Sequence, residues 1–321
     1  MNSTAVSNAA NSAAPELLIL AGTTASGKTD VSIPLAESLK GEIVSADARQ
    51  IFRELEIGTA KPSLVQLARV RHHFINERSV GERWTAGDFA REARARIEEI
   101  LARGRIPVVV GGSMLYLRAL TDGFYEEELT GHADYRALRR EWENGGGEAL
   151  YAELQMCDRD LAAHTAARDH HRILRGLWVF RRHGLRLSDL QDLPAKPIGR
   201  RFRLYFLHAD RAQTYQRVNA RVLRMIEDGL IEEVRALAAQ GFDETNCNAL
   251  RAHGYQEVFP YLRGEISRQQ VMEAVQKAVR HYVKRQLTWF RRDPRAVWIE
   301  RRFDESPQAV AGRIREEFLR A

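Results

Sequence analysis

A phosphate site is indicated by one stretch of eight residues, Gly22-Thr23-Thr24-Ala25-Ser26-Gly27-Lys28-Thr29. It has the G-x-x-x-x-G-K-S/T spacing, in which glycines let successive backbone N–H groups converge on an anion. Lys28 would add a positive charge, and the Thr29 hydroxyl is the group that would hold Mg²⁺ as a cofactor. The sequence therefore predicts a phosphate-binding loop, although the pattern alone does not say whose phosphate it holds.

Asp47 is the strongest candidate for a general base. It ends the segment 42–47, which we expect to be a strand, and ligands of open parallel sheets lie beyond the carboxyl ends of strands. A carboxylate at that position can reach a nucleophile beside the phosphates. The alternative is that Asp47 holds Mg²⁺, directly or through a water, and transfers no proton.

Ser113 lies in a second glycine turn, Gly111-Gly112-Ser113, which follows the apolar run 106–110 and opens a helix. The turn offers a hydroxyl and backbone N–H groups at another strand end. The run carries no acidic residue at its end, and the chain has no Asn-Lys-x-Asp sequence. These two absences argue against an ATPase motor and against a guanine-reading GTPase.

The elements that must position these residues alternate between strand and helix. This pattern predicts an α/β fold, a P-loop-containing parallel sheet with helices on both faces. We expect strands at 17–21, 42–47, 106–110, 202–207 and 297–299. We expect helices at 30–39 and 88–102, then a helix that bends near Gly229 within 214–240, and a long helix at 268–292.

The chain also predicts a second domain. No strand signal occurs between 126 and 196, where short amphipathic segments indicate helices. We therefore expect an all-helical insertion at 126–198, within a core formed by 15–125 and 199–321. Residues 1–14 have no charged side chain and no apolar run, so we expect a disordered tail and not a signal peptide.

The net charge of +6 is unevenly distributed. Residues 168–203 hold ten Lys and Arg against three Asp and Glu, and residues 277–302 hold nine against two. Such segments are typical of a nucleic-acid partner, although two solvated helix faces would give the same charge. Trp289 and Phe290 lie among these Lys and Arg residues, and a combination of basic and aromatic residues suits RNA. We nevertheless expect at least one of the two aromatic residues to pack in the core.

Other residue types exclude several classes of protein. Cys157 and Cys247 lack motif spacing, so we expect neither a disulfide framework nor a zinc site. His72 and His73 lack a third ligand at suitable spacing and are expected to be structural. No apolar run approaches the ~20 residues of a membrane helix. These features suit a protein of the reducing cytoplasm.

Two classes of function fit these residues. One is a small-molecule or nucleotide kinase that binds ATP in the P-loop. The other is a transferase that moves a group from a diphosphate donor to a nucleic acid. The two basic segments favour the transferase.

Six motifs occur in a fixed order along the chain. They are Thr24-Ala25-Ser26-Gly27-Lys28-Thr29, Ser45-Ala46-Asp47-Ala48-Arg49-Gln50-Ile51-Phe52 with Ile57-Gly58-Thr59-Ala60-Lys61-Pro62, Gly111-Gly112-Ser113-Met114-Leu115-Tyr116, His171-Arg172-Ile173-Leu174-Arg175, Gly254-Tyr255 and Lys284-Arg285-Gln286-Leu287-Thr288-Trp289-Phe290-Arg291. This set resembles the bacterial tRNA dimethylallyltransferases, also called tRNA isopentenyltransferases. The resemblance spans residues 16–302, nearly the whole chain.

The resemblance implies that the P-loop holds the diphosphate of dimethylallyl diphosphate. The dimethylallyl group would go to N6 of adenosine 37 in tRNA, beside the anticodon. Asp47 would take the N6 proton, while Lys28 and Mg²⁺ at Thr29 would stabilise the leaving diphosphate. Ser113 and Arg136 match positions that hold the adenine or the diphosphate. The resemblance also implies a monomeric cytoplasmic enzyme with no obligate protein partner.

The resemblance further implies that the helical insertion grips the tRNA anticodon stem-loop. The positions that match tRNA contacts are Asp47, Ala48, Arg49, Gln50, His171, Arg172, Ile173, Leu174, Arg175, Arg251, Lys284, Arg285, Gln286 and Arg291. The chain departs from the family pattern at Ala48, Phe52 and Ser113, where Ser, Tyr and Thr are usual. Because Ser113 lacks the methyl group that fixes a Thr rotamer, we expect a difference in positioning and not in the reaction.

Overall fold

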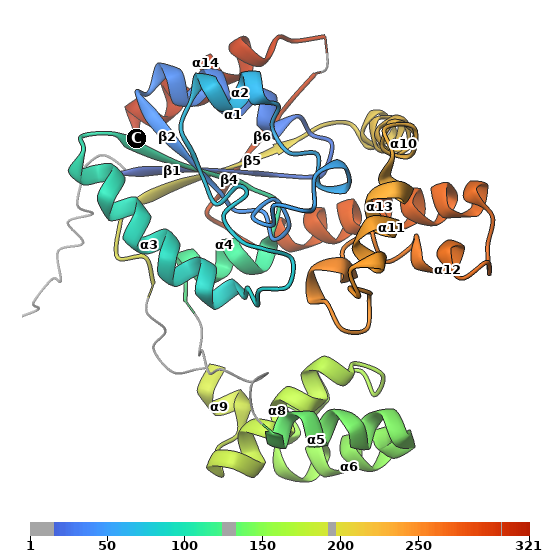
Figure 1. Cartoon of the computed structure of the whole chain (residues 1–321). Coiled ribbons are helices and arrows are strands. Elements are labelled where there is room, and N and C mark those ends of the chain that lie inside the picture. The colour runs from blue at the N-terminus through green and yellow to red at the C-terminus, as the bar shows by residue number, and fades with distance from the viewer. Residues whose placement is uncertain (1–15, 124–132, 192–196, 303) are drawn as a thin grey trace, which may run out of the picture. The chain divides into compact units, whose positions relative to one another are not determined.

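The computed structural model describes residues 16–123, 133–191, 197–302 and 304–321. It divides into two compact units, a larger one made from the chain up to Leu120 and from Gly199 onward, and a smaller one at Thr121–Ile198 (Figure 1). The smaller unit therefore begins five residues before the predicted position of 126 and ends at the predicted 198. The predicted tail, 1–14, lies outside the described residues.

The larger unit is built on a six-stranded sheet in which every described pairing is parallel. The strand order is β3-β2-β4-β1-β5-β6. The bounds are β1 Leu17–Gly22, β2 Gly41–Ser45, β3 His72–His73, β4 Ile106–Gly111, β5 Phe202–His208 and β6 Ala296–Glu300. All of β1 is buried, because it lies between two other strands and has helices over both faces. The sequence prediction missed only β3, a strand of two residues.

Helices cover both faces of this sheet, as the alternating pattern predicts (Figure 1). One face carries α1 (Lys28–Ser38), α2 (Leu64–Arg69) and α14 (Pro307–Arg320), and the other carries α3 (Ala86–Ala102) and α4 (Met114–Thr121). The helix α14 was not predicted. Its Val310, Ile314 and Phe318 are buried in one cluster with Leu18 and Leu20 of the central strand.

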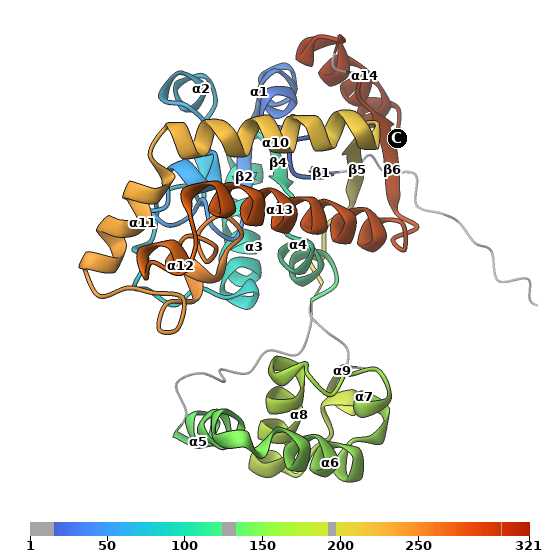
Figure 2. The same cartoon turned by 90° about the vertical axis from the view of Figure 1, so that its right-hand side faces the viewer.

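The remaining helices of the larger unit follow β5. They are α10 (Arg211–Glu227), α11 (Leu230–Ala239), α12 (Phe259–Leu262) and α13 (Arg268–Phe290). Gly229 separates α10 from α11 with a φ of +103°, which explains the predicted bend because glycine adopts this conformation readily. Figure 2 shows α10 and α13 side by side, and residues of the two helices are in contact.

The smaller unit is helical in every described residue that has regular structure. Its elements are α5 (Ala133–Glu141), a π-turn η2 (Trp142–Gly146), α6 (Gly147–Cys157), α7 (Arg159–Ala163), α8 (His170–His183) and α9 (Leu187–Gln191). The unit has its own apolar core, in which Leu150, Ile173 and Trp178 are almost completely buried. Asp169 caps the start of α8, and Gly184 ends it in a left-handed conformation.

None of the helices in the described part of the chain is long and apolar enough to cross a membrane.

Candidate functional site

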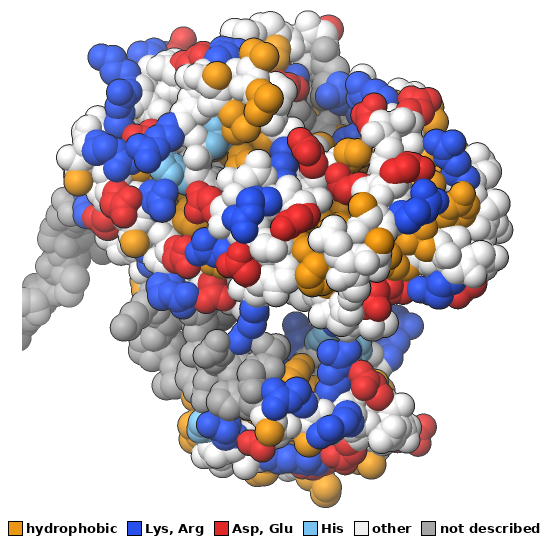
Figure 3. Space-filling model, viewed as in Figure 1, with side chains coloured by type: hydrophobic (Ala, Val, Ile, Leu, Met, Phe, Trp, Pro, Cys, Tyr) orange, Lys and Arg blue, Asp and Glu red, His pale blue; other side chains and the backbone are white. Residues whose placement is uncertain are grey.

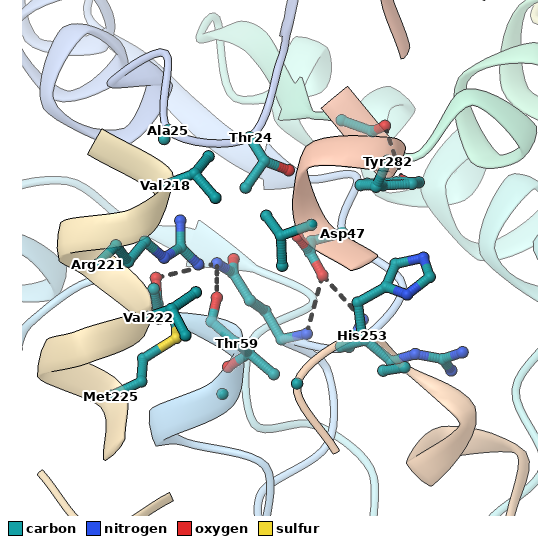
Figure 4. A pocket seen from close by; sticks show the side chains of 18 of the residues that line it. Thr24, Ala25, Asp47, Thr59, Val218, Arg221, Val222, Met225, His253 and Tyr282 are labelled. Atoms are coloured by element: carbon teal, nitrogen blue, oxygen red, sulfur yellow. Dashed lines mark hydrogen bonds between the residues drawn. The ribbon is translucent and has the colours of Figure 1, made fainter. Parts of the chain in front are cut away.

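A pocket of about 630 Å³ lies at the carboxyl ends of β1, β2 and β4. Three strand-end loops form one wall, and they contain the P-loop, Asp47 and Ser113. Much of the remaining lining comes from the helices α10 and α13 and the loop 251–255. In the view of Figure 4, α10 side chains lie on one side of Asp47, and His253 and Tyr282 lie on the other. The structure thus brings the predicted phosphate loop, base and hydroxyl into one cavity.

Lys28 points back onto the P-loop in this structure. Its Nζ donates to the carbonyls of Gly22 at 2.9 Å and Thr23 at 2.8 Å. Burial lowers the pKa of Lys28 from 10.5 to about 8, although the charge of Asp47 acts in the opposite direction. A bound anion would give the ammonium a stronger partner than two carbonyls and would raise its pKa.

Two arginines of α10 add positive charge to this part of the pocket. Arg221 lines the pocket, and burial lowers the pKa of its guanidinium while Asp47 opposes that shift. Arg217 also lines the pocket, and its Nε donates to the carbonyl of Ala25 at 3.2 Å. The sequence prediction did not include either residue. A signal was present, because Arg217, Arg221 and Arg224 follow the i, i+4, i+7 spacing of one helix face.

Asp47 is held by a turn of its own backbone. Its Oδ1 accepts N–H groups from Arg49 at 2.9 Å and from Gln50 at 3.3 Å. The Gln50 side chain in turn donates to the carbonyls of Thr59 and Ala60, each at 3.3 Å. The carboxylate is therefore fixed in orientation by the residues that follow it.

The loop that supports Gln50 is anchored by α11. Glu233 accepts the backbone N–H of Ile57 at 2.9 Å through Oε2, and the Tyr255 hydroxyl at 2.6 Å through Oε1. The Tyr255 ring packs directly on Gly58, where any Cβ would overlap it. Two of the sequence motifs, 57–62 and Gly254-Tyr255, are thus parts of one buried support for the Asp47 loop.

Gln286 of α13 joins the two glycine loops. Its Oε1 accepts the N–H of Thr24 at 2.9 Å, and its Nε2 donates to the carbonyl of Gly112 at 2.9 Å. A side chain at Gly112 would overlap the Gln286 amide, which explains the glycine. Gln286 was predicted to contact tRNA, but it is only 1% exposed and both ends of its amide bind protein. In this structure Gln286 positions the two loops, and its contact with tRNA stays a prediction.

The other predicted tRNA contacts of the larger unit lie nearer to solvent. Lys284, Arg285 and Arg291 are exposed, and Arg285 shares a 2.7 Å hydrogen bond with the His253 ring. The predicted contacts Ala48, Arg49, Gln50 and Arg251 line the pocket. Phe290 is in the core against Phe206, as expected for at least one of the two aromatic residues, whereas Trp289 is 38% exposed.

In the smaller unit, the predicted tRNA contacts on α8 divide between its two faces. His171 and Arg172 are exposed, and Arg175 is half-buried. The side chains of Ile173 and Leu174, also predicted to contact tRNA, are buried in the core of the unit because they form the apolar face of α8. Arg136, predicted to be catalytic, is exposed on α5 of this unit.

Charged side chains of both signs cover the surface. On the face shown in Figure 3, Lys and Arg are interspersed with Asp and Glu over the larger unit, and several basic side chains cover the smaller one.

His73, predicted to be structural, shares a 2.7 Å hydrogen bond with Glu42, which also pairs with Arg103. Among the described residues, no group of three or more His, Cys, Asp or Glu could hold a metal ion.

Comparison with known proteins agrees with this geometry. Residues 50–293 match the family model described as "IPP transferase". The chain is 40% identical over 286 residues to tRNA dimethylallyltransferase 1 of Citrifermentans bemidjiense, covering 89% of this chain and 92% of the relative. It is also 40% identical to tRNA dimethylallyltransferase 1 of Syntrophotalea carbinolica, with 90% and 92% covered.

Two solved structures share the fold over most of the chain. The tRNA isopentenylpyrophosphate transferase of Bacillus halodurans is 31% identical, with a TM-score of 0.68 over 95% of this chain and 97% of that one. A eukaryotic dimethylallyltransferase acting on tRNA is 25% identical, with a TM-score of 0.78 over 96% of this chain and 80% of that one. By sequence and by fold, this chain belongs to the IPP transferase family, whose curated members include the tRNA dimethylallyltransferases.

Proposed function

We propose that this protein transfers the dimethylallyl group from dimethylallyl diphosphate to N6 of adenosine 37 in tRNA. The products would be N6-(dimethylallyl)adenosine and diphosphate. One observation carries the proposal: a single pocket joins a P-loop to Asp47 and to an apolar wall. An apolar wall would also suit the adenine of ATP; the similarity to tRNA dimethylallyltransferases favours the prenyl donor.

The P-loop would bind the diphosphate of the donor. Cleavage of the allylic C–O bond moves the bonding electrons onto the diphosphate, so the site must stabilise negative charge. Lys28 and Arg221 supply positive charge there, and the start of α1 supplies N–H groups. Lys28 would exchange the carbonyls of Gly22 and Thr23 for phosphate oxygens.

Mg²⁺ fits this site as a partner of the diphosphate. Thr29 lines the pocket, and Mg²⁺ is usually held by one or two protein oxygens together with phosphates and waters. When bound, the ion would neutralise charge on the leaving group. Thr29 would hold it through the side-chain hydroxyl.

The dimethylallyl chain would lie against the apolar wall. Val218, Val222 and Met225 of α10 line the pocket (Figure 4). Val275 and Val279 of α13 line it as well. Aliphatic side chains exclude water and suit a five-carbon chain with no polar atoms. Excluding water also protects the cationic allylic carbon from hydrolysis.

Asp47 would act on the adenine. The N6 nitrogen attacks the allylic carbon as the C–O bond breaks, and the Asp47 carboxylate takes a proton from N6. Ser113 lines the pocket, and we expect Ser113 and Arg136 to help hold the adenine or the diphosphate. The adenine must leave its stack to enter the pocket.

The tRNA would be bound through its phosphates and bases. Positive charge for the RNA phosphates would come from the exposed cations of α13 and from the exposed face of α8. We expect the protein to act as a cytoplasmic monomer. Arg251 and Gln50, which line the pocket, would contact nucleotides beside the target adenine.

The test uses an unmodified anticodon stem-loop RNA with dimethylallyl diphosphate and Mg²⁺, and separately with ATP. We expect the RNA to gain the mass of one dimethylallyl unit, and we expect no gain with a stem-loop whose adenosine 37 is replaced by guanosine. Phosphoryl transfer or hydrolysis with ATP, without any mass gain from the prenyl donor, would show a kinase instead.

A further inference from the structure

A buried arginine from the C-terminal part of the chain lies against the phosphate-binding loop. Arg301 follows β6, and its backbone N–H donates to the carbonyl of His208 at 2.8 Å, which extends the pairing of β5 with β6. Its side chain turns toward the P-loop, where Nη1 donates to the carbonyl of Ser26 at 3.0 Å. Arg301 is only 6% exposed. It lies 275 residues after Ser26 in the sequence, so the fold and not the local chain brings the two together.

The contact with Arg301 leaves no room for a side chain at Gly27 of the loop. Gly27 has a φ of +81°, and a Cβ added there would overlap the Arg301 guanidinium. The glycine is therefore needed for its backbone conformation and also for the close approach of Arg301.

Arg301 acts on the peptide that presents a loop N–H. The Ser26 carbonyl and the Gly27 N–H belong to the same peptide group, so a donor at the carbonyl fixes the plane of that N–H. It also polarises the peptide, which makes the N–H a stronger donor. The preceding carbonyl, that of Ala25, is bound in the same way by Arg217 at 3.2 Å. Two successive loop peptides are thus held from the carbonyl side by guanidinium groups.

The buried charge has a cost. Burial lowers the pKa of Arg301, with Asp30 acting in the opposite direction and Arg217 adding to the decrease. A site that collects cations around a short loop suits a ligand with several negative charges. An anion bound by the loop would offset the cost of keeping this guanidinium out of water.

We propose that Arg301 is a positioning residue for diphosphate: it holds the Ser26–Gly27 peptide and places a fixed positive charge behind the P-loop. The inference rests on the proposed function, because it takes diphosphate to be the ligand of the loop. Arg301 lies outside the six motifs, although it belongs to the basic segment 277–302, because its role depends on the pairing of β6 with β5.

The test measures binding of inorganic diphosphate, in the presence of Mg²⁺, to the full chain by calorimetry. Arg301→Gln removes the charge and, because its side chain is two bonds shorter, also the donor to the Ser26 carbonyl, and we expect it to weaken binding about tenfold or more. Arg301→Lys keeps the charge, and we expect it to bind within about threefold of the wild type. Neither change should alter the KM for the RNA, because Arg301 acts on the donor side.

Arg313→Gln is the matched control. Arg313 donates to the carbonyl of Glu300 at 3.0 Å, and Glu300 precedes Arg301 in the sequence. Unlike Arg301, Arg313 is exposed. We expect this variant to bind diphosphate like the wild type. Equal binding by the Gln and Lys variants of Arg301 would overturn the inference, as would an equal loss in the Arg313 control.

Folding and function are separated by two further readouts. Thermal unfolding is measured for each variant to show that it folds. If Arg301→Gln does not fold, the test rests on Arg301→Lys, and a loss of diphosphate affinity of more than tenfold in the folded Lys variant contradicts the inference. If the wild type itself does not bind diphosphate and does not prenylate RNA, the proposed function fails. If it does both and Arg301→Gln binds equally well, only the role of Arg301 is wrong.

Discussion

The two walls of the pocket are built in different ways. The strand-end wall consists of short loops that leave β1, β2 and β4, and it carries the P-loop, Asp47 and Ser113. The helix wall consists of α10, α13 and the loop 251–255, and it carries arginines, aliphatic side chains and Tyr282. The sheet fixes the reacting groups to rigid strand ends, whereas the helices supply the surroundings of the donor.

This difference suggests a division of labour. Asp47 and Ser113 each lie two residues beyond a strand, where the backbone has little freedom. The helix wall adds charge and apolar surface over a larger area, so each of its residues carries less of the chemistry. Substitutions in the strand-end wall should therefore affect the rate most, and those in the helix wall should affect binding and positioning.

Asp47 should give the largest effect. We expect Asp47→Ala to reduce prenyl transfer by about 10³-fold or more, because the general base is lost, while tRNA binding stays within about twofold. Asp47→Asn keeps an oxygen for the N–H groups of Arg49 and Gln50 but takes no proton, and it should be equally inactive. Single-turnover assays measure both variants. An Asn variant with a near wild-type rate would show that Asp47 only orders the loop.

Arg221 tests the helix wall. We expect Arg221→Gln to lower kcat/KM for dimethylallyl diphosphate by about 10²-fold, because a charge that stabilises the leaving group is removed. Arg235→Gln is the matched control, since Arg235 is exposed on α11 and pairs with Glu232. Steady-state kinetics with saturating RNA measure the difference. If Arg221→Gln and the control behave alike, the helix wall does not serve the leaving group.

Gln286 links the two walls, so its loss should disturb both. We expect Gln286→Met to lower the free energy of unfolding by about 2 kcal/mol, because the N–H of Thr24 and the carbonyl of Gly112 lose their buried partner. Gln276→Met on the same helix removes one hydrogen bond, to the carbonyl of Asn219, and should cost less than about 1 kcal/mol. Urea unfolding compares them. An equal decrease in the free energy of unfolding for both variants would mean that the two hydrogen bonds of Gln286 contribute no more to stability than the single one of Gln276.

The two walls also differ in how far the sequence predicts them. The P-loop, Asp47 and Ser113 were predicted because each lies within a few residues of an apolar strand, and local pattern specifies that geometry. The arginines of α10 were missed, because an amphipathic helix does not reveal which partner its polar stripe faces. Arg301 was missed for the same reason at longer range, since only strand pairing brings it to the loop.

The positions predicted to contact tRNA show the same limit. Gln286 looks like part of a polar, basic helix surface in the sequence, but its side chain faces two loops and is buried. Ile173 and Leu174 belong to a motif, yet their side chains form the core of the smaller unit. A motif marks a segment that matters, whereas packing decides which of its side chains reach solvent.

The outward face of α13 should give the smallest effects. Lys284 and Arg291 are exposed, on the helix whose inward face carries Gln286, so they test whether one helix serves both the pocket and the RNA. We expect Lys284→Ala or Arg291→Ala to weaken binding of the stem-loop only several-fold at 0.1 M salt, and to reduce the slope of log K against log salt by about 0.7 to 0.9 for each lost phosphate contact. Arg315→Ala, exposed on α14, is the control and should leave the slope unchanged. Because counterion release responds only to phosphate contacts, an unchanged slope in both α13 variants would place the RNA elsewhere and confine α13 to shaping the pocket.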